Sequence, residues 1–566
     1  MNYRNIPLRY SVLLAFCVGA TSFTSAQAAV QTPGIGQILQ QLPPSTPTAP
    51  ILSAPQINIP PKAVKAPASS QSFFVRKIDL TGNTVFPAAK LQALVAGSEG
   101  QNLTLTQLDA LAGKITDYYH QHGYFLSYAY IPPQTLQNGI VHIAILEAKY
   151  GKTRLHNSSR VDNGLLKAVL DPFQPGAPVA LTPLQYRLML MSTIPGVVVS
   201  PATFSPGSAI GTSNMDITTT AGPPVQGNIL IDNYGSRYTG HEQFGGGVIL
   251  NSPLGIGDRL SLQGLGSNNG NLAYGQIGYS VPLDGFGTRL GADYSYLHYH
   301  LGSTLANLNA HGNAWVADIH LTQPFYLTPE SSFYGRLEYN HKGLNDDIGA
   351  AYILNARHIN EMKAILYGNH RDALLGGGIT SYMVSYTYGA LAFNNSAAEA
   401  ADLSTAHTAG NFSKWMVNIS RLQTLPLDTT LFLNFQGQAT NNNLDSVEQL
   451  VLGGAYLLPG YPQGATAGDS GYAVTAELRH PLPIPIPGRW QGQVLADHGH
   501  VTFNQHLWNG FTGPNAASLS DVGFGVQWSY RHFVSNIVLA WRVGGYSDAL
   551  ASSSPMHAWW SVGYRF

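Results

Sequence analysis

Apolar and polar residues alternate along short segments in most of the chain beyond Gln226, and turn residues separate these segments. Successive side chains of a strand point to opposite faces, so the alternation predicts strand after strand, each with one apolar face. About 340 residues, at roughly 20 residues per strand and connection, give about 16 antiparallel strands, an even number within the range of outer-membrane barrels. The pattern therefore predicts an all-β transmembrane barrel over residues 223–566.

The last predicted strand is the clearest of these. One face carries Trp560, Val562, Tyr564 and Phe566 at every second position, and the opposite face is mostly small or polar. A soluble antiparallel sheet can alternate in the same way. Aromatic residues gathered at the end of such a strand are typical of the girdles of a membrane barrel. We therefore interpret these four residues as a C-terminal barrel signal.

Residues 73–148 have a different pattern, in which helical and strand periods alternate. Pro87 can begin a first helix, and Thr104 with Gln107 forms a possible capping box for a second. Two strands, 124–131 and 140–147, follow the second helix. The order of strand, helix, helix, strand, strand predicts a small α+β domain.

A second α+β domain is predicted at 149–222. Apolar residues recur at helical spacing in 163–170 and 183–191, although the period of the first is weak. Short strands are expected at 197–199 and 215–219.

The N-terminal part has the composition of a leader and a linker. Residues 1–28 have a basic start at Arg4 and Arg9, an apolar core and a small-residue cleavage site, which predicts a secretory signal peptide. Residues 29–72 are rich in proline, which predicts an extended linker. Within it, residues 34–42 form either a docked helix on a tether or part of a disordered segment.

Composition supports a membrane location. Charged residues make up 10% of the chain, far below the roughly 25% of soluble domains. No segment after the leader is apolar for the about 18 residues that a spanning helix needs. A net charge of −1 argues against a nucleic-acid partner. The single cysteine, Cys17, lies in the leader, so no disulfide is expected.

The sequence carries no catalytic motif. It has no Gly-x-Ser-x-Gly nucleophile turn and no His-Glu-x-x-His zinc motif. His498 and His500 share one strand face and could bind a metal, but that face is predicted to point outward, so we expect rim histidines. We predict a protein that is not an enzyme and has no cofactor and no metal.

Several stretches, in this order, resemble one known family, the two-partner secretion transporters, or haemolysin activation/secretion proteins. They are Gly123-Tyr124, Ile131-Pro132, Gln134, Gly139, Glu147, Ile194-Pro195-Gly196, Pro206-Gly207, 211–213, 232–240, 251–258, 444–449 and 452–454. The family belongs to the superfamily of the insertase BamA. The resemblance implies a plug helix, a linker, two periplasmic POTRA domains and a 16-stranded barrel in the outer membrane of a Gram-negative bacterium.

Two positions depart from the family. Its lumen loop has the pattern Val-Arg-Gly-Tyr or Val-Arg-Gly-Phe, whereas this chain has Leu458, Pro459, Gly460 and Tyr461. The family arginine pairs with a barrel-wall aspartate, and Asp497 matches its position. Without the arginine, we expect Asp497 to stay solvated and the loop to be held by backbone contacts and the rigidity of Pro459. The family's Glu-Gly is also changed, to Glu147-Ala148, which matters only if residue 148 needs a positive φ.

The resemblance implies export of a large secreted exoprotein that has an N-terminal secretion domain. An unfolded client can add itself to an exposed sheet edge through its main chain, and we expect Tyr124, Phe125, Tyr128 and Tyr130 of the first POTRA domain to contact it. The alternative is that these domains act only as spacers. The other expected partners are outer-membrane lipid, lipopolysaccharide and the barrel assembly machinery.

Three rival functions remain open on the sequence. A BamA-like insertase normally has more POTRA domains and keeps the loop arginine. A passive porin has no need of two preceding α+β domains. A surface adhesin or haemolysin itself would show long β-helix repeats, which this sequence lacks.

Overall fold

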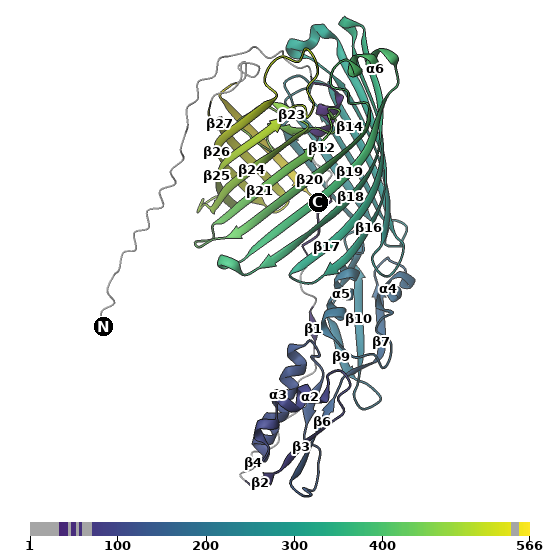
Figure 1. The fold of residues 1–566 in the computed structure, drawn as a ribbon, viewed down its shortest axis with the longest axis vertical. Coiled ribbons are helices and arrows are strands. Elements are labelled where there is room, and N and C mark those ends of the chain that lie inside the picture. Colours follow the sequence, from purple (N-terminus) through teal and green to yellow (C-terminus); the bar gives the residue numbers. More distant parts are fainter. Residues whose placement is uncertain (1–32, 43–46, 52–55, 59–70, 545–553) are drawn as a thin grey trace, which may run out of the picture.

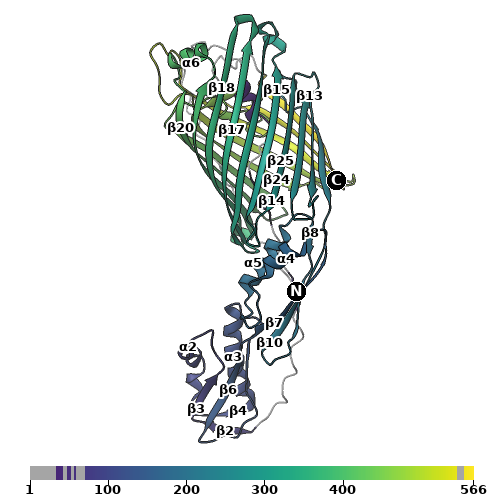
Figure 2. The ribbon, with the colours of Figure 1, turned by 90° about the vertical axis from the view of Figure 1, so that its right-hand side faces the viewer.

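The computed structural model describes residues 33–42, 47–51, 56–58, 71–544 and 554–566. The predicted signal peptide lies outside the described residues, as does Cys17. The molecule is a barrel with two α+β domains stacked beneath one rim (Figures 1 and 2). No helix among the described residues is long and apolar enough to cross a membrane.

Sixteen antiparallel strands form the closed barrel, as the alternation predicted. They are β11 (Val225–Asp232), β12 (Gln243–Asn251), β13 (Arg259–Ser267), β14 (Leu272–Pro282), β15 (Arg289–His300), β16 (Ala310–Leu327), β17 (Ser331–Ile348), β18 (Ile353–Asp372), β19 (Gly378–Phe393), β20 (Gly410–Thr424), β21 (Thr430–Thr440), β24 (Ser470–Pro481), β25 (Arg489–Thr502), β26 (Ala516–Tyr530), β27 (Phe533–Arg542) and β28 (Met556–Arg565). Strand β28 closes the barrel by pairing with β11, from Asn228 opposite Arg565 to Asp232 opposite Ser561.

The two faces of the wall differ in chemistry. On β28, Trp560, Val562, Tyr564 and Phe566 are exposed on the outer face, whereas the neighbouring Trp559 is 5% exposed on the inner face. Many inward side chains are polar or charged and are covered by other parts of the chain, such as Glu338, Glu361 and Lys414. An apolar exterior and a polar interior are what a barrel solvated by lipid requires.

The first α+β domain contains β2 (Ser72–Val75), β3 (Lys77–Thr81), α2 (Ala88–Ala93), η1 (Ala96–Ser98), β4 (Gln101–Thr104), α3 (Leu105–Gln121), β5 (Tyr128–Tyr130) and β6 (Ile140–Leu146). Its sheet has the order β3-β6-β5, and β2 pairs separately with β4. The capping box predicted at Thr104 and Gln107 begins α3. The short strand β4 lies directly before this box and was not predicted, because four residues carry little periodicity.

The second α+β domain contains β7 (Lys149–Ser158), α4 (Asn163–Leu170), α5 (Leu181–Ser192), β8 (Val197–Val199), β9 (Ala202–Pro206) and β10 (Thr212–Ala221). Strands β7 and β9 were not predicted. Helix α5 lies against the barrel rim, where the Tyr186 hydroxyl donates to the Pro324 carbonyl oxygen at 3.3 Å and Arg187 Nη1 donates to the Gly285 carbonyl oxygen at 2.8 Å. Leu327 and Tyr334 of the barrel join the core of this domain.

The structure describes residues 33–42, 47–51, 56–58 and 71–72 of the linker. Helix α1 (Ile35–Gln40) lies inside the barrel, where it appears as the short purple segment in Figure 1. Farther along, Asn369 Nδ2 donates to the Ala49 and Pro50 carbonyl oxygens at 3.3 and 3.2 Å. Strand β1 (Ile57–Asn58) then pairs in parallel with β9, so the sheet of the second domain has the order β1-β9-β10-β7, with β8 on β10.

The connection between β21 and β24, residues 441–469, folds into the barrel, and we call it the lumen loop. It contains the hairpin β22 (Leu450–Leu452) and β23 (Thr466–Gly468). The remaining short helices lie in other connections: η2 (Ser303–Leu308), η3 (Gly349–Ala351), η4 (Leu374–Gly376) and α6 (Ser396–Leu403).

Candidate functional site: the barrel lumen and its two obstructions

Helix α1 is packed tightly inside the barrel. Ile35 and Ile38 are 0% and 2% exposed, in a cluster that includes Tyr299, Leu344 and Leu444. A Cβ added to Gly36 would lie 2.3 Å from Ser446 Oγ and 2.4 Å from the Val447 backbone nitrogen. Glycine at this position therefore permits the close contact between α1 and the lumen loop.

A chain of polar contacts joins α1 to the wall and to the lumen loop. The Ile35 N–H donates to Asp346 Oδ1 at 2.7 Å, and Arg357 Nη1 donates to Asp346 Oδ2 at 2.8 Å. Arg357 Nε then donates to Asp445 Oδ2 at 2.6 Å. Asp346 and Arg357 belong to the wall strands β17 and β18, and Asp445 belongs to the lumen loop. Arg357 therefore connects the residue that holds helix α1 with the lumen loop.

A second buried ionic group holds the lumen loop. Glu448 lies 2.6 Å from Lys342 Nζ and 2.8 Å from Lys414 Nζ, and Lys342 also lies 3.0 Å from Glu361. All four residues lie in the lumen with little exposure. Buried ion pairs of this kind are strongly destabilised when one partner is removed, because the other charge is left unpaired.

The tip of the lumen loop is held by its backbone. The Gly460 N–H donates to Asp521 Oδ2 at 2.8 Å, and Trp559 Nε1 donates to the Pro459 carbonyl oxygen at 2.7 Å. The Tyr461 hydroxyl donates to the Ser520 carbonyl oxygen at 3.0 Å, and Leu458, with a φ of 59°, is fully buried. Backbone contacts thus take the place of a side-chain charge.

The wall residue that meets this tip is Asp521, not Asp497. Asp497 lies on β25, directly opposite Asp521 on β26. The expectation that Asp497 stays solvated is wrong, because it is only 6% exposed and Asp521 only 1%. The loop covers the pair, since a Cβ on Gly460 would lie 2.4 Å from the Asp521 Cβ. The alternation of β26 indicates that Asp521 points inward, but it cannot indicate which loop atom it meets.

The four aromatic residues proposed to contact a client have different environments. Tyr128 and Tyr130, on the edge strand β5, are 44% and 40% exposed, with ring centroids 5.9 Å apart. Phe125 packs against Phe204 of the second domain at 5.7 Å, and Tyr124 packs against Phe86 at 5.5 Å. The tyrosines of β5 therefore offer an aromatic surface, whereas Tyr124 and Phe125 pack against neighbouring side chains.

Hydrogen bonds to Glu147 join residues 84–85 to helix α3 in the first domain. It accepts hydrogen bonds from the backbone N–H groups of Thr84 and Val85, both at 2.8 Å, and from the Tyr119 hydroxyl at 2.7 Å. Burial by itself would raise the pKa of Glu147, but these hydrogen bonds, with one from the Thr84 hydroxyl, outweigh it and lower the pKa. Burial and the contact with Glu147 raise the pKa of Tyr119. Ala148 has no positive φ, so alanine meets no backbone strain there.

The histidines and acidic groups of the barrel are held by hydrogen bonds and ion pairs. His498 and His500 are hydrogen-bonded to the Ser520 and Ser518 hydroxyls at 2.8 and 2.9 Å. Within the described part of the chain, Asp293, Asp318 and His320 bring potential ligand atoms within 4.8 Å of one another. His320 Nδ1 already lies 3.0 Å from Asp318, and Arg336 lies 3.4 Å from the same carboxylate.

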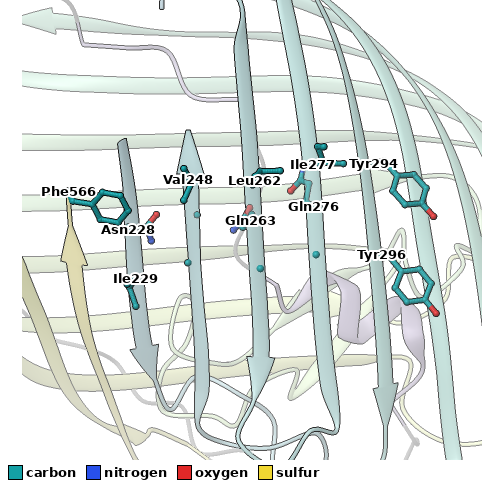
Figure 3. A pocket seen from close by; sticks show the side chains of 14 residues that line it. Asn228, Ile229, Val248, Leu262, Gln263, Gln276, Ile277, Tyr294, Tyr296 and Phe566 are labelled. Carbon is teal, nitrogen blue, oxygen red and sulfur yellow. The ribbon is translucent and has the colours of Figure 1, made fainter. Parts of the chain in front are cut away.

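A groove of about 630 Å³ lies on the outer wall beside the β11–β28 seam (Figure 3). Its floor is a row of glycines in register on three strands, Gly246, Gly264 and Gly275. Ile229 and Tyr296 continue this row on either side. The groove exists because three neighbouring strands present no side chain at this level.

These features define a class of protein, a sixteen-stranded β-barrel of the outer-membrane type with two α+β domains below one rim and with a helix and a loop inside the barrel. The family model of the haemolysin secretion/activation proteins ShlB/FhaC/HecB matches residues 211–518, more than half of the 566-residue chain. The ShlB-type POTRA domain matches residues 73–148. The chain belongs to the ShlB/FhaC/HecB family, so the resemblance found in the sequence is confirmed.

Individual relatives agree with this assignment. The chain is 26% identical over 477 residues to the heme/hemopexin transporter protein HuxB of Haemophilus influenzae strain 86-028NP, covering 83% of this chain and 84% of that protein. It is 24% identical over 510 residues to the outer membrane transporter CdiB of Dickeya dadantii strain 3937, covering 86% and 89%.

Solved structures show the same fold. CdiB from Escherichia coli matches with a TM-score of 0.70 at 21% identity, covering 91% of this chain and 94% of that one. BamA from Haemophilus ducreyi without its POTRA domains 1–3 matches with a TM-score of 0.51 at 14% identity, covering 87% and 100%. The family consists of transporters, and its members are located in the outer membrane with their POTRA domains in the periplasm.

Proposed function

We propose that the protein captures a large exoprotein through that client's N-terminal secretion domain in the periplasm and exports it through the barrel. The observation that carries this proposal is what lies inside the barrel. A short helix and one loop fill part of the interior of the closed sixteen-stranded wall. Both are segments that can move aside without breaking a wall strand. The names of relatives such as HuxB and CdiB are consistent with such a role.

The second POTRA domain supports a capture site that works by strand addition. Its β9 edge already accepts an added strand, since the Ala202 N–H donates to the Gln56 carbonyl oxygen of the linker at 3.1 Å and β1 pairs along it. We propose that an extended client takes the place of β1 at this edge, because backbone pairing tolerates many side chains. The edges of the first domain are less open, since Thr116 accepts from Ala129 N–H and Glu99 from Ile78 N–H.

This arrangement couples capture to opening. Strand β1 and helix α1 belong to the same linker, so a client that displaces β1 releases one of the points that hold the linker. Tyr128 and Tyr130 would then contact client side chains beside the second domain. No nucleotide is available in the periplasm, so folding of the client outside the cell would give the direction of export.

The remaining proposed partners follow from the surface. Hydrocarbon tails of outer-membrane lipid and lipopolysaccharide cover the apolar exterior, including the groove in Figure 3. The aromatic face of β28 is proposed to be recognised by the barrel assembly machinery during insertion.

A proline at the capture edge tests the proposal. Ala202→Pro removes the N–H that pairs with the added strand, whereas Ala202→Ser keeps it. Cells that co-express the cognate exoprotein should lose its secretion with Ala202→Pro and keep it with Ala202→Ser, at equal amounts of folded barrel. Secretion by the proline variant at the normal level would contradict capture at β9.

Further measurements distinguish the rival functions. An insertase would change the amounts of other outer-membrane proteins when its gene is removed, while a secretion transporter changes only the exported client. A passive porin would conduct equally well with and without residues 34–42, whereas an obstructing helix should suppress conductance.

A further inference from the structure

Asp497 and Asp521 form an unusual pair on the lumen wall. They lie directly opposite each other in the β25–β26 ladder, where Cβ atoms are about 4.5–5.5 Å apart. Both are buried, with 6% and 1% exposure, and as register partners on neighbouring strands their side chains lie on the same face of the wall. Two carboxyl groups at this distance, covered by the lumen loop, need a positive charge or a proton between them.

The hydrogen bonds of the pair are incomplete. Asp521 Oδ2 accepts from the Gly460 N–H, but Asp521 Oδ1 and Asp497 Oδ2 are buried and receive no hydrogen bond from any described residue. Buried carboxylate oxygens without a donor are costly, so groups of this kind are normally paired.

The surrounding charged groups do not supply the missing donor. On β24, Arg479 is bonded to Glu477 at 2.8 Å. On β27, Arg542 lies opposite Asp521 in register but donates to neither unpartnered oxygen. On β28, His557 is hydrogen-bonded to the Gly460 carbonyl oxygen at 3.1 Å. At the loop tip, the Tyr461 hydroxyl donates to the Ser520 carbonyl oxygen at 3.0 Å.

We propose that Asp497 and Asp521 share one proton and that this pair positions the lumen loop. The protonated carboxyl is a donor to the other carboxylate, which leaves a single charge, and Asp521 accepts the Gly460 N–H with its second oxygen. Loss of the shared proton places two like charges beneath the loop tip and loosens it. Because Gly36 of α1 lies against Ser446 of the same loop, a loosened loop also loosens the helix.

Infrared spectroscopy tests the proton directly, on the full chain in lipid vesicles. Wild-type protein at neutral pH should show the carbonyl stretch of a buried, protonated carboxylic acid, and Asp497→Asn and Asp521→Asn should each remove it. Glu477→Gln is the control and should keep it. Absence of the band from the wild type would overturn the proposal. The resistance of the unheated barrel to detergent on gels checks that each variant has folded.

Channel recordings test the positioning role. Raising the pH should increase the frequency of open events of the wild type by about tenfold or more, as like charges appear at close range. Asp497→Asn should give a low, pH-independent frequency, because its amide N–H donates to Asp521 in place of the proton. An unchanged pH profile in Asp497→Asn, or a wild-type frequency that depends on which cation is present rather than on pH, would overturn the proposal, the latter by showing a bound cation.

The inference rests on the proposed function only in treating the lumen loop as an obstruction. A failure of client capture would leave the infrared band and its loss in the aspartate variants unchanged, so the two proposals fail separately.

Discussion

Asp346 on the barrel wall accepts the first backbone N–H of helix α1, from Ile35, at 2.7 Å. The same carboxylate accepts from the Tyr299 hydroxyl at 2.6 Å and from Arg357 at 2.8 Å. The helix is therefore held by a carboxylate that is itself fixed by two other wall residues. The hydrogen bond to Asp346 fixes the position of α1, in which Gly36 lies against the lumen loop.

Replacing this carboxylate should loosen the helix. Asp346→Asn keeps the shape but weakens the hydrogen bond to Ile35 and the pairing with Arg357, at a cost of about 1–3 kcal/mol. The open fraction in planar-bilayer recordings should rise by roughly fivefold to a hundredfold. Asp347→Asn is the matched control, because the Asp347 side chain is 44% exposed next to His311. Equal conductance of the two variants would show that Asp346 does not hold the helix.

A methyl group on the helix should have a similar effect by a steric route. Gly36→Ala places a carbon 2.3–2.4 Å from Ser446 and Val447, so α1 or the loop must shift. Gly34→Ala is the control, since its added carbon lies 3.6 Å from Asp346 at ordinary contact distance. We expect increased conductance for Gly36→Ala, by about tenfold for a cost of about 1.4 kcal/mol, and little change for Gly34→Ala. The reverse order would contradict the packing of α1 on the loop.

The first POTRA domain should depend on pH through Glu147. Its folded pKa is lowered by the hydrogen bonds it accepts, so its contribution to stability is complete above the unfolded value of about 4.3 and is lost as the pH falls through the folded pKa. Glu147→Gln should remove this dependence and cost about 1–3 kcal/mol at neutral pH. Hydrogen exchange of the peptide around Thr84, compared between variant and wild type at each pH, measures both effects. Identical exchange at all pH values would contradict the role of Glu147.

A charged residue on the apolar outer face of β28 should destabilise the folded barrel. Val562→Arg places a guanidinium against lipid tails at a cost of up to about 2–4 kcal/mol, depending on depth, whereas Val562→Leu keeps the face apolar. The fraction of folded barrel, measured by its altered mobility before heating, should fall for the arginine variant only. Normal folding of Val562→Arg would show that this side of β28 does not face hydrocarbon.

Much of the fold could be predicted because its signals are local. The alternation that makes one face of β28 aromatic needs only neighbouring residues, and sixteen such segments give the barrel. The Thr104–Gln107 capping box and helix α4 are likewise fixed by a few adjacent positions. Among the strands that escaped prediction, β4 and β9 are four and five residues long. Strand β7 has ten residues but only two large apolar side chains, Tyr150 and Leu155, so it lacks a clear alternation.

The candidate site depended on contacts between distant segments. Asp497 and Asp521 both point inward by their own alternation, yet only the fold decides that Asp521 meets Gly460, 61 residues away. The same holds for α1: the residues at 34–42 left a docked helix and a disordered segment both open, and only the fold places Ile35 and Ile38 in contact with the wall and the lumen loop.

The sequence by itself thus determined the class of architecture and the chemistry of each wall face, because strand alternation depends on neighbouring residues along the chain. Only the tertiary structure decided which side chains meet in the lumen, that β1 lies on β9, and that two carboxyl groups face each other beneath the loop. The physical reason is that such contacts depend on barrel closure and strand register, which relate residues tens to hundreds of positions apart.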